Sequence, residues 1–303
     1  MQNKIIILGG TGFIGKRLAN HLKQNGYEII ILSRNPGQST KLLPEFQHIK
    51  WDLENHSYWR DFINGAYGII NLAGASIGGH RWTRKYKEQI LSSRLTSTNA
   101  LVKEILKSDN PPRVLINASG VDYYGNTGNV EVDESTPAGN GFLASVCRQW
   151  EEAAFKASSI TRVVVARQGL ILASEALAMK RMLLPFKLFI GGPLGDGKQW
   201  FPWIHINDVV EMYRWILEND DIKGPVNFVS PEQLTMNQFS KELGKILHRP
   251  SIFKVPEFML RIAVGESTDM IVNSKKVKPK IALENGFKFK IRELQKALED
   301  ITS

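Results

Sequence analysis

Short aliphatic runs alternate with amphipathic segments along the first 170 residues of the chain. The runs are too short for core helices and are bounded by glycine or polar residues, so they predict buried strands at 4–8, 28–33, 47–51, 66–74, 113–119 and 161–167. Apolar residues recur at helical spacing over 13–22, 83–107 and 142–157. Strands that alternate with helices are typical of βαβ units, so the sequence predicts an α/β fold with a doubly wound, mainly parallel sheet.

The alternation becomes irregular after residue 167. In the remaining chain the pattern predicts a turn-rich loop at 191–197, a short strand at 203–206 and a helix at 207–218 that is opened by an Asn or Asp cap. It then predicts another strand at 225–229 and two or three further helices from 235 onward. We therefore expect a nucleotide-binding domain at 1–167 and a substrate-side portion at 168–303.

Three glycines lie between the first predicted strand and the first predicted helix. In a dinucleotide site the first glycine permits a tight turn, the second lets the backbone approach the pyrophosphate, and the third lets the helix pack on the strand. The pyrophosphate then contacts amide groups at the helix N-terminus. The residues expected to line this part of the cofactor site are Gly9, Thr11, Gly12, Phe13, Ile14 and Gly15.

The second strand ends about 20 residues further on, at the position that reads the ribose. An NAD enzyme carries Asp or Glu there, whereas this chain has Ser33 and Arg34. A guanidinium suits a 2′-phosphate, so the pair favours NADP(H) over NAD(H). The alternative interpretation of Arg34 is a solvated arginine in a loop.

Composition narrows the function classes. The 303 residues are 43% hydrophobic and include a single cysteine, Cys147, and six scattered histidines, so we expect a sizeable core but neither internal disulfides nor a metal site. We expect a cytoplasmic protein, since no apolar run reaches the ~18 residues of a membrane span and the start lacks a secretory signal.

The formal net charge is +9, but Lys and Arg are spread along the chain without a nucleic-acid-binding motif. We therefore expect no nucleic-acid and no membrane partner. A nucleotide cofactor and an anionic small-molecule substrate account for the charge, and a merely soluble basic surface accounts for it equally well. The sequence leaves the oligomeric state open, a homodimer included.

Several motifs together resemble one protein group, the atypical extended short-chain dehydrogenase/reductases of the NAD(P)-dependent "epimerase family". They are the glycine motif at 9–15, Arg81-Trp82-Thr83, Ser119 with Tyr123-Tyr124-Gly125, Phe142-Leu143-Ala144 leading to Cys147-Arg148 and Trp150-Glu151, Gly191 to Gly197, Gln199-Trp200-Phe201, and Trp203-Ile204-His205-Ile206-Asn207-Asp208. The resemblance implies that Asp52, followed by Leu53, contacts the adenine and that Leu72-Ala73-Gly74 form the cofactor motif after the fourth strand. It also implies a small C-terminal domain of uncertain role at about 249–303.

The superfamily normally places a Tyr-x-x-x-Lys pair on the helix after the fifth strand, where the Lys lowers the pKa of the Tyr that moves the proton. This chain has Phe142 and Val146 at those positions, and neither side chain can carry a proton. We therefore expect Ser119, Tyr123 and Tyr124 to provide the polar groups that act on the substrate in place of the missing pair. The alternative for Ser119 is a loop cap, and the alternative for either Tyr is packing against substrate. A phenol without a nearby Lys keeps a pKa of ~10, so activity should be weak and rise with pH.

The expected substrate contacts are Arg167, Trp203 and His205, with buried structural pairing as the alternative for Arg167 and His205. Two functions follow. The first is an NADP(H)-binding oxidoreductase or epimerase-like isomerase that acts on a small anionic or nucleotide-linked substrate. The second is a nonenzymatic NADP(H)-binding regulatory protein, for example one linked to cell division.

Overall fold

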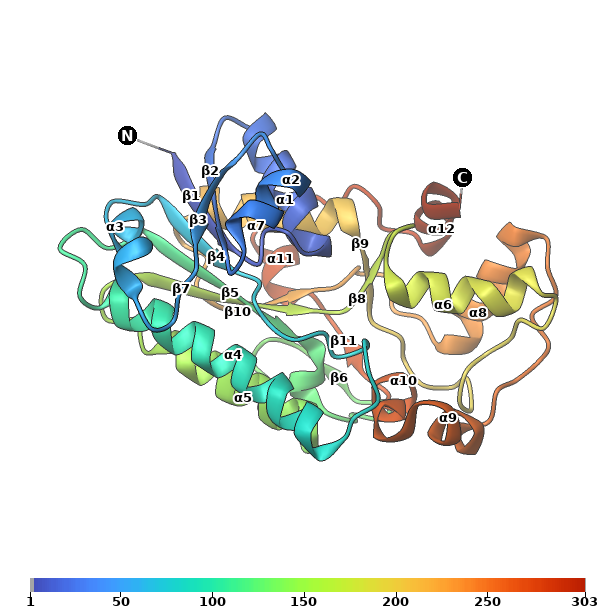
Figure 1. The fold of residues 1–303 in the computed structure, drawn as a ribbon. Coiled ribbons are helices and arrows are strands. Elements are labelled where there is room, and N and C mark those ends of the chain that lie inside the picture. The colour runs from blue at the N-terminus through green and yellow to red at the C-terminus, as the bar shows by residue number, and fades with distance from the viewer. Residues whose placement is uncertain (1–2, 303) are drawn as a thin grey trace.

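A seven-stranded parallel sheet forms the centre of the computed structural model, which describes residues 3–302 (Figure 1). The strand order is β10-β7-β5-β4-β1-β2-β3. The bounds are β1 (Lys4–Leu8), β2 (Glu28–Ser33), β3 (Gln47–Lys50), β4 (Gly68–Asn71), β5 (Val114–Gly120), β7 (Arg162–Gln168) and β10 (Gly224–Phe228). The predicted doubly wound parallel sheet is confirmed.

Helices cover both faces of this sheet. Alternate residues of β1 point to opposite faces. Ile5 and Ile7 belong to the core that includes buried residues of α1 (Phe13–Gln24) and α7 (Ile206–Glu218), whereas Ile6 and Leu8 belong to the core beneath α4 (Arg84–Ile105) and α5 (Phe142–Phe155). Because each strand is buried on both sides, its sequence is a continuous apolar run, as the pattern predicted.

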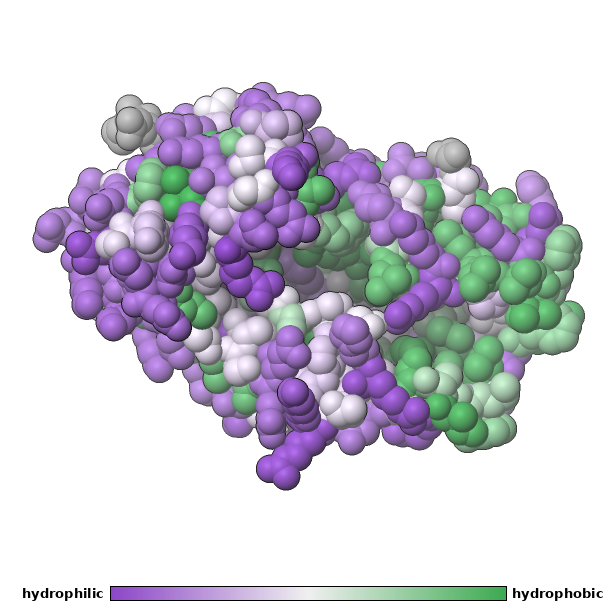
Figure 2. Space-filling model, viewed as in Figure 1, coloured by the Kyte–Doolittle hydropathy of each residue, from purple (hydrophilic) through white to green (hydrophobic). Residues whose placement is uncertain are grey.

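The chain beyond β7 builds a second lobe and then returns to the sheet. Figure 1 shows α6, α8 and α9 grouped at one end of the molecule, and Figure 2 shows a hollow between this lobe and the N-terminal part. The remaining elements are α2 (Pro36–Leu42), η1 (His56–Tyr58), α3 (Arg60–Ile63), η2 (Val121–Tyr124), β6 (Glu131–Val132), β8 (Leu170–Leu172), α6 (Leu177–Lys187), β9 (Trp203–His205), α8 (Met236–Leu247), α9 (Glu257–Val264), η3 (Gly265–Thr268), α10 (Asp269–Val272), β11 (Lys276–Val277), α11 (Lys280–Glu284) and α12 (Leu294–Thr302).

Two details differ from the sequence predictions. Residues 235–302 contain five α-helices rather than two or three, because α10 and α11 are too short to show a helical period. The helix α7 is capped by His205, whose Nδ1 accepts the Asn207 amide at 3.3 Å, and not by Asn207 or Asp208. The Asp208 carboxylate instead accepts the backbone amides of residues 290 and 291.

The boundary at residue 167 does not coincide with the edge of the sheet. Strand β10 pairs with β7 as the seventh strand, and α7 packs on the same face as α1. Residues of the substrate-side portion therefore complete the nucleotide-binding sheet. No helix within residues 3–302 is long and apolar enough to cross a bilayer.

Candidate functional site

The turn between β1 and α1 fits a dinucleotide pyrophosphate. Gly9 has a φ of +84°, and the Gly12 amide donates to the Gly9 carbonyl at 3.0 Å. A Cβ on Gly15 would lie 2.4 Å from the Gly9 oxygen, so only glycine fits there. No side chain caps α1, and its first turn contains no acidic residue. The first amide groups of the helix are thus available to an anion.

The sheet changes direction of winding beside this turn, since β1 lies between β2 and β4. Ligands of open α/β sheets bind at such a switch point, beyond the carboxyl ends of the strands. The segment Leu72-Ala73-Gly74 after β4 lies here, and a Cβ on Gly9 would come within 3.0 Å of the Leu72 carbonyl carbon. The Ala73 amide donates to the Asn71 side chain at 3.2 Å. The structure thus brings the two predicted cofactor motifs together.

Arg34 lies exposed just beyond β2. Within residues 3–302 its guanidinium forms no hydrogen bond or ion pair, and the Ser33 hydroxyl accepts the Asn35 amide at 3.3 Å. An unpaired guanidinium at the ribose-reading position can bind a 2′-phosphate with charge-assisted hydrogen bonds.

Asp52 follows β3 and shapes the loop in which it lies. One carboxylate oxygen is 2.7 Å from the Lys50 ammonium, and the other accepts the backbone amides of Glu54 and Asn55. The Lys50 hydrogen bond, with these amides, lowers the pKa of Asp52 to about 2. Leu53, the next residue, is exposed. Contact of Asp52 and Leu53 with adenine stays a prediction.

A buried polar network joins the carboxyl ends of β5, β7 and β10. Arg167 forms a bidentate ion pair with Glu151, with N–O distances of 3.0 and 2.8 Å, and Ser119 donates to the same carboxylate at 2.6 Å. Arg167 also donates to the Tyr124 hydroxyl at 3.0 Å, and that hydroxyl donates to Asn227 at 2.7 Å. The network therefore uses the polar groups of Ser119, Tyr124 and Arg167 within the protein.

The two neighbouring tyrosines have different environments. Burial raises the pKa of Tyr124 to about 12, above the value of ~10 expected for it, although Arg167 and Asn227 oppose the shift. Tyr123 is half-buried, and its ring centroid lies 3.5 Å from the Arg167 guanidinium carbon. Its hydroxyl forms no hydrogen bond with any residue between 3 and 302. Of the two phenols, Tyr123 is the one available to a ligand.

Trp203 and His205 lie inside the protein. Both side chains are 0% exposed, and Trp203 belongs to the core beneath α7. The His205 Nε2 is 3.1 Å from the Asp300 carboxylate, while burial lowers the pKa of the imidazole. In this conformation neither side chain reaches a ligand in the hollow, so their contact with substrate stays a prediction.

Apolar side chains occupy the positions of the missing Tyr-Lys pair. Val146 is buried, and Phe142 packs edge-on against Trp82 with ring centroids 5.2 Å apart. The Lys87 ammonium lies 4.9 Å from the Phe142 ring centroid. Neither position offers a group that titrates.

Sequence reasoning missed Glu151, Glu134 and Asn227, which complete the polar network. A signal was present for Glu151, which follows Cys147 by four residues and precedes Ala154 by three. It therefore belongs to the apolar stripe of its helix, where an acid needs a buried partner. No local signal marks Glu134 or Asn227, because their partners are distant in the sequence.

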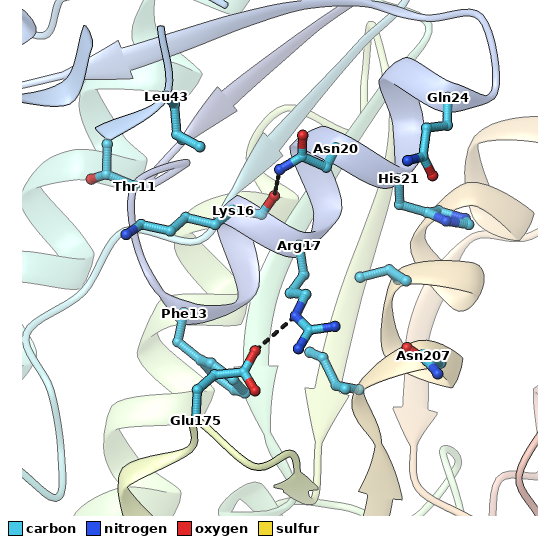
Figure 3. A pocket seen from close by; sticks show the side chains of 12 residues that line it. Thr11, Phe13, Lys16, Arg17, Asn20, His21, Gln24, Leu43, Glu175 and Asn207 are labelled. Carbon is cyan, nitrogen blue, oxygen red and sulfur yellow. Dashed lines mark hydrogen bonds and ion pairs between the residues drawn. The ribbon is translucent and has the colours of Figure 1, made fainter. Parts of the chain in front are cut away.

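A groove of about 600 Å³ lies beside the glycine turn, between α1 and the start of α7 (Figure 3). It shares Thr11 and Phe13 with the turn. Figure 3 shows Lys16 reaching toward Thr11, while Arg17 pairs with Glu175 at 2.7 Å. The groove therefore adds positive charge next to the proposed pyrophosphate position.

The chain matches two family models. One, described as the NAD dependent epimerase/dehydratase family, covers residues 5–167. The other, described as a domain of unknown function (DUF1731), covers residues 255–301. The resemblance found in the motifs is thereby confirmed.

Relatives and solved structures match almost the whole chain. The "Epimerase family protein SDR39U1 homolog, chloroplastic" of Arabidopsis thaliana is 35% identical over 302 residues, which cover 99% of this chain and 87% of the relative. The crystal structure of human epimerase family protein SDR39U1 (isoform 2) with NADPH is 34% identical, with a TM-score of 0.90 and 98% of both chains covered. A nucleoside-diphosphate sugar epimerase of Corynebacterium glutamicum is 27% identical, with a TM-score of 0.77 over 98% of this chain and 57% of that one.

We predict that Gly15→Ala disrupts the cofactor turn. The added methyl would lie 2.4 Å from the Gly9 oxygen, and overpacking of this kind costs about 1–3 kcal/mol. Urea unfolding should show this loss, and titration should show weaker binding of NADPH. Gly78→Ala is the control, because a Cβ there meets nothing within 4 Å. If the two variants had the same free energy of unfolding and the same affinity for NADPH, the tight packing at Gly15 would be contradicted.

A second prediction concerns the buried ion pair. Glu151→Gln leaves the Arg167 guanidinium buried without its anion, which should lower the free energy of unfolding by about 3–5 kcal/mol in urea titrations. Glu88→Gln breaks the exposed pair with Arg84 and should change it by less than about 1 kcal/mol. Similar small losses in both variants would show that Glu151 is not needed to hold Arg167.

Proposed function

The chain belongs to the NAD dependent epimerase/dehydratase family, and on that premise we propose that it is an NADP(H)-dependent enzyme. The observation that carries the proposal is the glycine turn, which has no room for a Cβ at Gly15, together with the exposed Arg34 just beyond β2, whose guanidinium is unpaired within residues 3–302. NADP(H), when bound, supplies or accepts a hydride at its nicotinamide. The crystallisation of a 34% identical human relative with NADPH supports this choice of cofactor.

The reaction we propose is oxidation, reduction or epimerisation of a small anionic or nucleotide-linked substrate in the hollow between the two lobes. The net charge of +9 favours an anionic substrate, and the likeness to a nucleoside-diphosphate sugar epimerase supports a nucleotide-linked one. Homodimers and a cytoplasmic location remain predictions.

Tyr123 is the residue we assign to the substrate. Its hydroxyl has no hydrogen-bond partner in residues 3–302, and it follows β5, whose end lies on the nicotinamide side of the switch point. The Arg167 guanidinium against its ring, held by Glu151, fixes the ring by a cation–π contact. Ser119 and Tyr124 then act as positioning residues, since both bond to the Glu151–Arg167 pair.

A regulatory protein that binds NADP(H) without turnover is the second candidate. The observation that favours it is the pair of apolar residues, Phe142 and Val146, at the positions of the Tyr-Lys dyad. Such a protein would need the glycine turn and Arg34 but not the Tyr123 hydroxyl.

Arg34→Ala tests the cofactor. Loss of one charge-assisted phosphate contact costs about 1.5–3 kcal/mol, so NADPH should bind roughly ten- to a hundredfold more weakly while NADH binding stays nearly unchanged. Isothermal titration of both cofactors measures this. Arg84→Ala removes an exposed arginine elsewhere and should change neither affinity. Equal affinities of the parent protein for NADPH and NADH would contradict the assignment.

The two tyrosines should respond differently to replacement by Phe. Tyr123→Phe should keep the free energy of unfolding within about 0.5 kcal/mol. It should slow turnover at least tenfold on any compound found in a screen of carbonyl and nucleotide-sugar substrates, because the substrate loses a positioning hydrogen bond. Tyr124→Phe should lower stability by about 1–3 kcal/mol, since two buried partners lose their hydrogen bond. Full turnover by the Tyr123 variant would remove it from the reaction, and NADPH binding without turnover of any compound would favour the regulatory function.

A further inference from the structure

A small cavity lined by both polar and apolar residues lies against Phe142, the residue at the position of the family's tyrosine. Its volume is about 30 Å³, which is room for one water molecule. Trp82 and Phe142 form its apolar wall, while Asp122 and Lys275 line it from η2 and from the segment before β11. Charged groups from two distant parts of the chain therefore meet beside an aromatic ring that cannot titrate.

Lys275 is buried in this cavity, and one of its three N–H donors has no acceptor among residues 3–302. Its side chain is 5% exposed, its ammonium is 3.2 Å from the Asp122 carboxylate, and it is 3.5 Å from the Asn273 carbonyl oxygen. An ammonium carries three N–H donors, and buried donors in proteins are normally paired. The third donor has no acceptor among residues 3–302, so it is available to a water or to a ligand oxygen.

The segment that carries Lys275 is fixed to the loop after η2. Ser274 donates to the Gly128 carbonyl at 2.6 Å and its own carbonyl accepts the Thr127 amide at 2.8 Å. Strand β11 pairs in parallel with β6. Since residues 255–301 match the domain of unknown function, that domain contributes Lys275 to the cavity, together with Asp269, Met270 and Asn273.

The cavity lies on the nicotinamide side of the cofactor crevice. A dinucleotide spans the switch point, and the exposed Arg34 beyond β2 assigns the adenosine half to the β1-β2-β3 side. The nicotinamide half then lies over β4, β5 and β7, and Asp122 follows the end of β5 by two residues. The cavity is therefore within the half of the site where the substrate reacts.

We propose that Lys275, paired with Asp122, is the proton donor of this enzyme and replaces the missing Tyr-Lys dyad. The inference rests on the proposed function. During reduction of a substrate carbonyl by NADPH, a hydride reaches the carbon, the C=O π electrons move to the oxygen, and that oxygen takes a proton from the Lys275 ammonium. The products are the alcohol, NADP⁺ and a neutral amine, which solvent reprotonates. Oxidation is the reverse.

Other charged or titratable groups near the cavity do not compete for this role. Asp269 also lines it but lies 3.1 Å from Arg261 in an exposed pair. The Lys87 ammonium, which lies over the Phe142 ring, is paired with Glu266 at 2.7 Å. Burial raises the pKa of the Cys147 thiol to about 12, so the thiol stays neutral at physiological pH. The Lys275–Asp122 pair, with side chains 5% and 21% exposed, is also a weak stabilising interaction, because apolar residues of similar volume serve as well. A chemical role explains its presence better.

The decisive measurement compares the affinities for NADP⁺ and NADPH, which differ by one positive charge on the nicotinamide. Removing the ammonium in Lys275→Met should tighten NADP⁺ relative to NADPH at least threefold. Removing the carboxylate in Asp122→Asn should weaken NADP⁺ relative to NADPH by a similar factor. Lys276→Met is the matched control, since its ammonium lies over Trp200 and near Glu131, and its ratio should stay within twofold of the parent.

The second measurement is the turnover number, kcat, for the first carbonyl compound that the screen identifies as a substrate. Lys275→Met should lose at least tenfold in kcat, whereas Lys275→Arg, which keeps the charge, should keep the parent's affinity ratio. Affinity ratios that do not respond to Lys275→Met or Asp122→Asn, or a Lys275→Met kcat within twofold of the parent, would overturn the inference. Failure of the parent to bind NADPH or to turn over any compound is a separate result that refutes the proposed function instead.

Discussion

The bidentate pair between Arg167 and Glu151 is the interaction on which the rest of the site depends. Both side chains are 4% exposed, and a buried ion is tolerated only when its charge and hydrogen-bonding groups are matched. Ser119 and Tyr124 provide the additional partners from the end of β5 and from η2. The need to satisfy one buried guanidinium thus fixes the ends of β5 and β7, the helix α5 and the turn η2 relative to one another.

A second buried carboxylate connects this network to the C-terminal domain. Glu134 accepts the backbone amides of Asn227, Lys280 and Ile281, so it links β10 to the start of α11. Burial raises its pKa, while the amides oppose the shift. Asn227 in turn accepts from Tyr124 and donates to the Lys278 carbonyl. Residues 278–281 therefore hold the tyrosine loop through hydrogen bonds and not through apolar contact alone.

This arrangement gives the C-terminal domain a structural part in the site. Its polypeptide contributes Lys275 to the cavity beside Phe142 and adds β11 to β6. The glycine turn itself is built from local sequence, whereas the polar network around Arg167 is built from contacts across the chain.

The sequence by itself determined the doubly wound sheet, the glycine turn and the place of Arg34, because each depends on residues close together in the chain. A buried strand needs a continuous apolar run, and Gly9 and Gly15 are dictated by a positive φ and by the lack of room for a Cβ. Only the tertiary structure showed that Tyr124 is buried in the network whereas Tyr123 is available to a ligand, and that Trp203 and His205 lie inside the protein. Only the tertiary structure brought Glu151, Glu134 and Lys275 to the site. Burial and ion pairing join residues that are far apart in the sequence, as in Lys275 with Asp122, and no local pattern encodes such a partner.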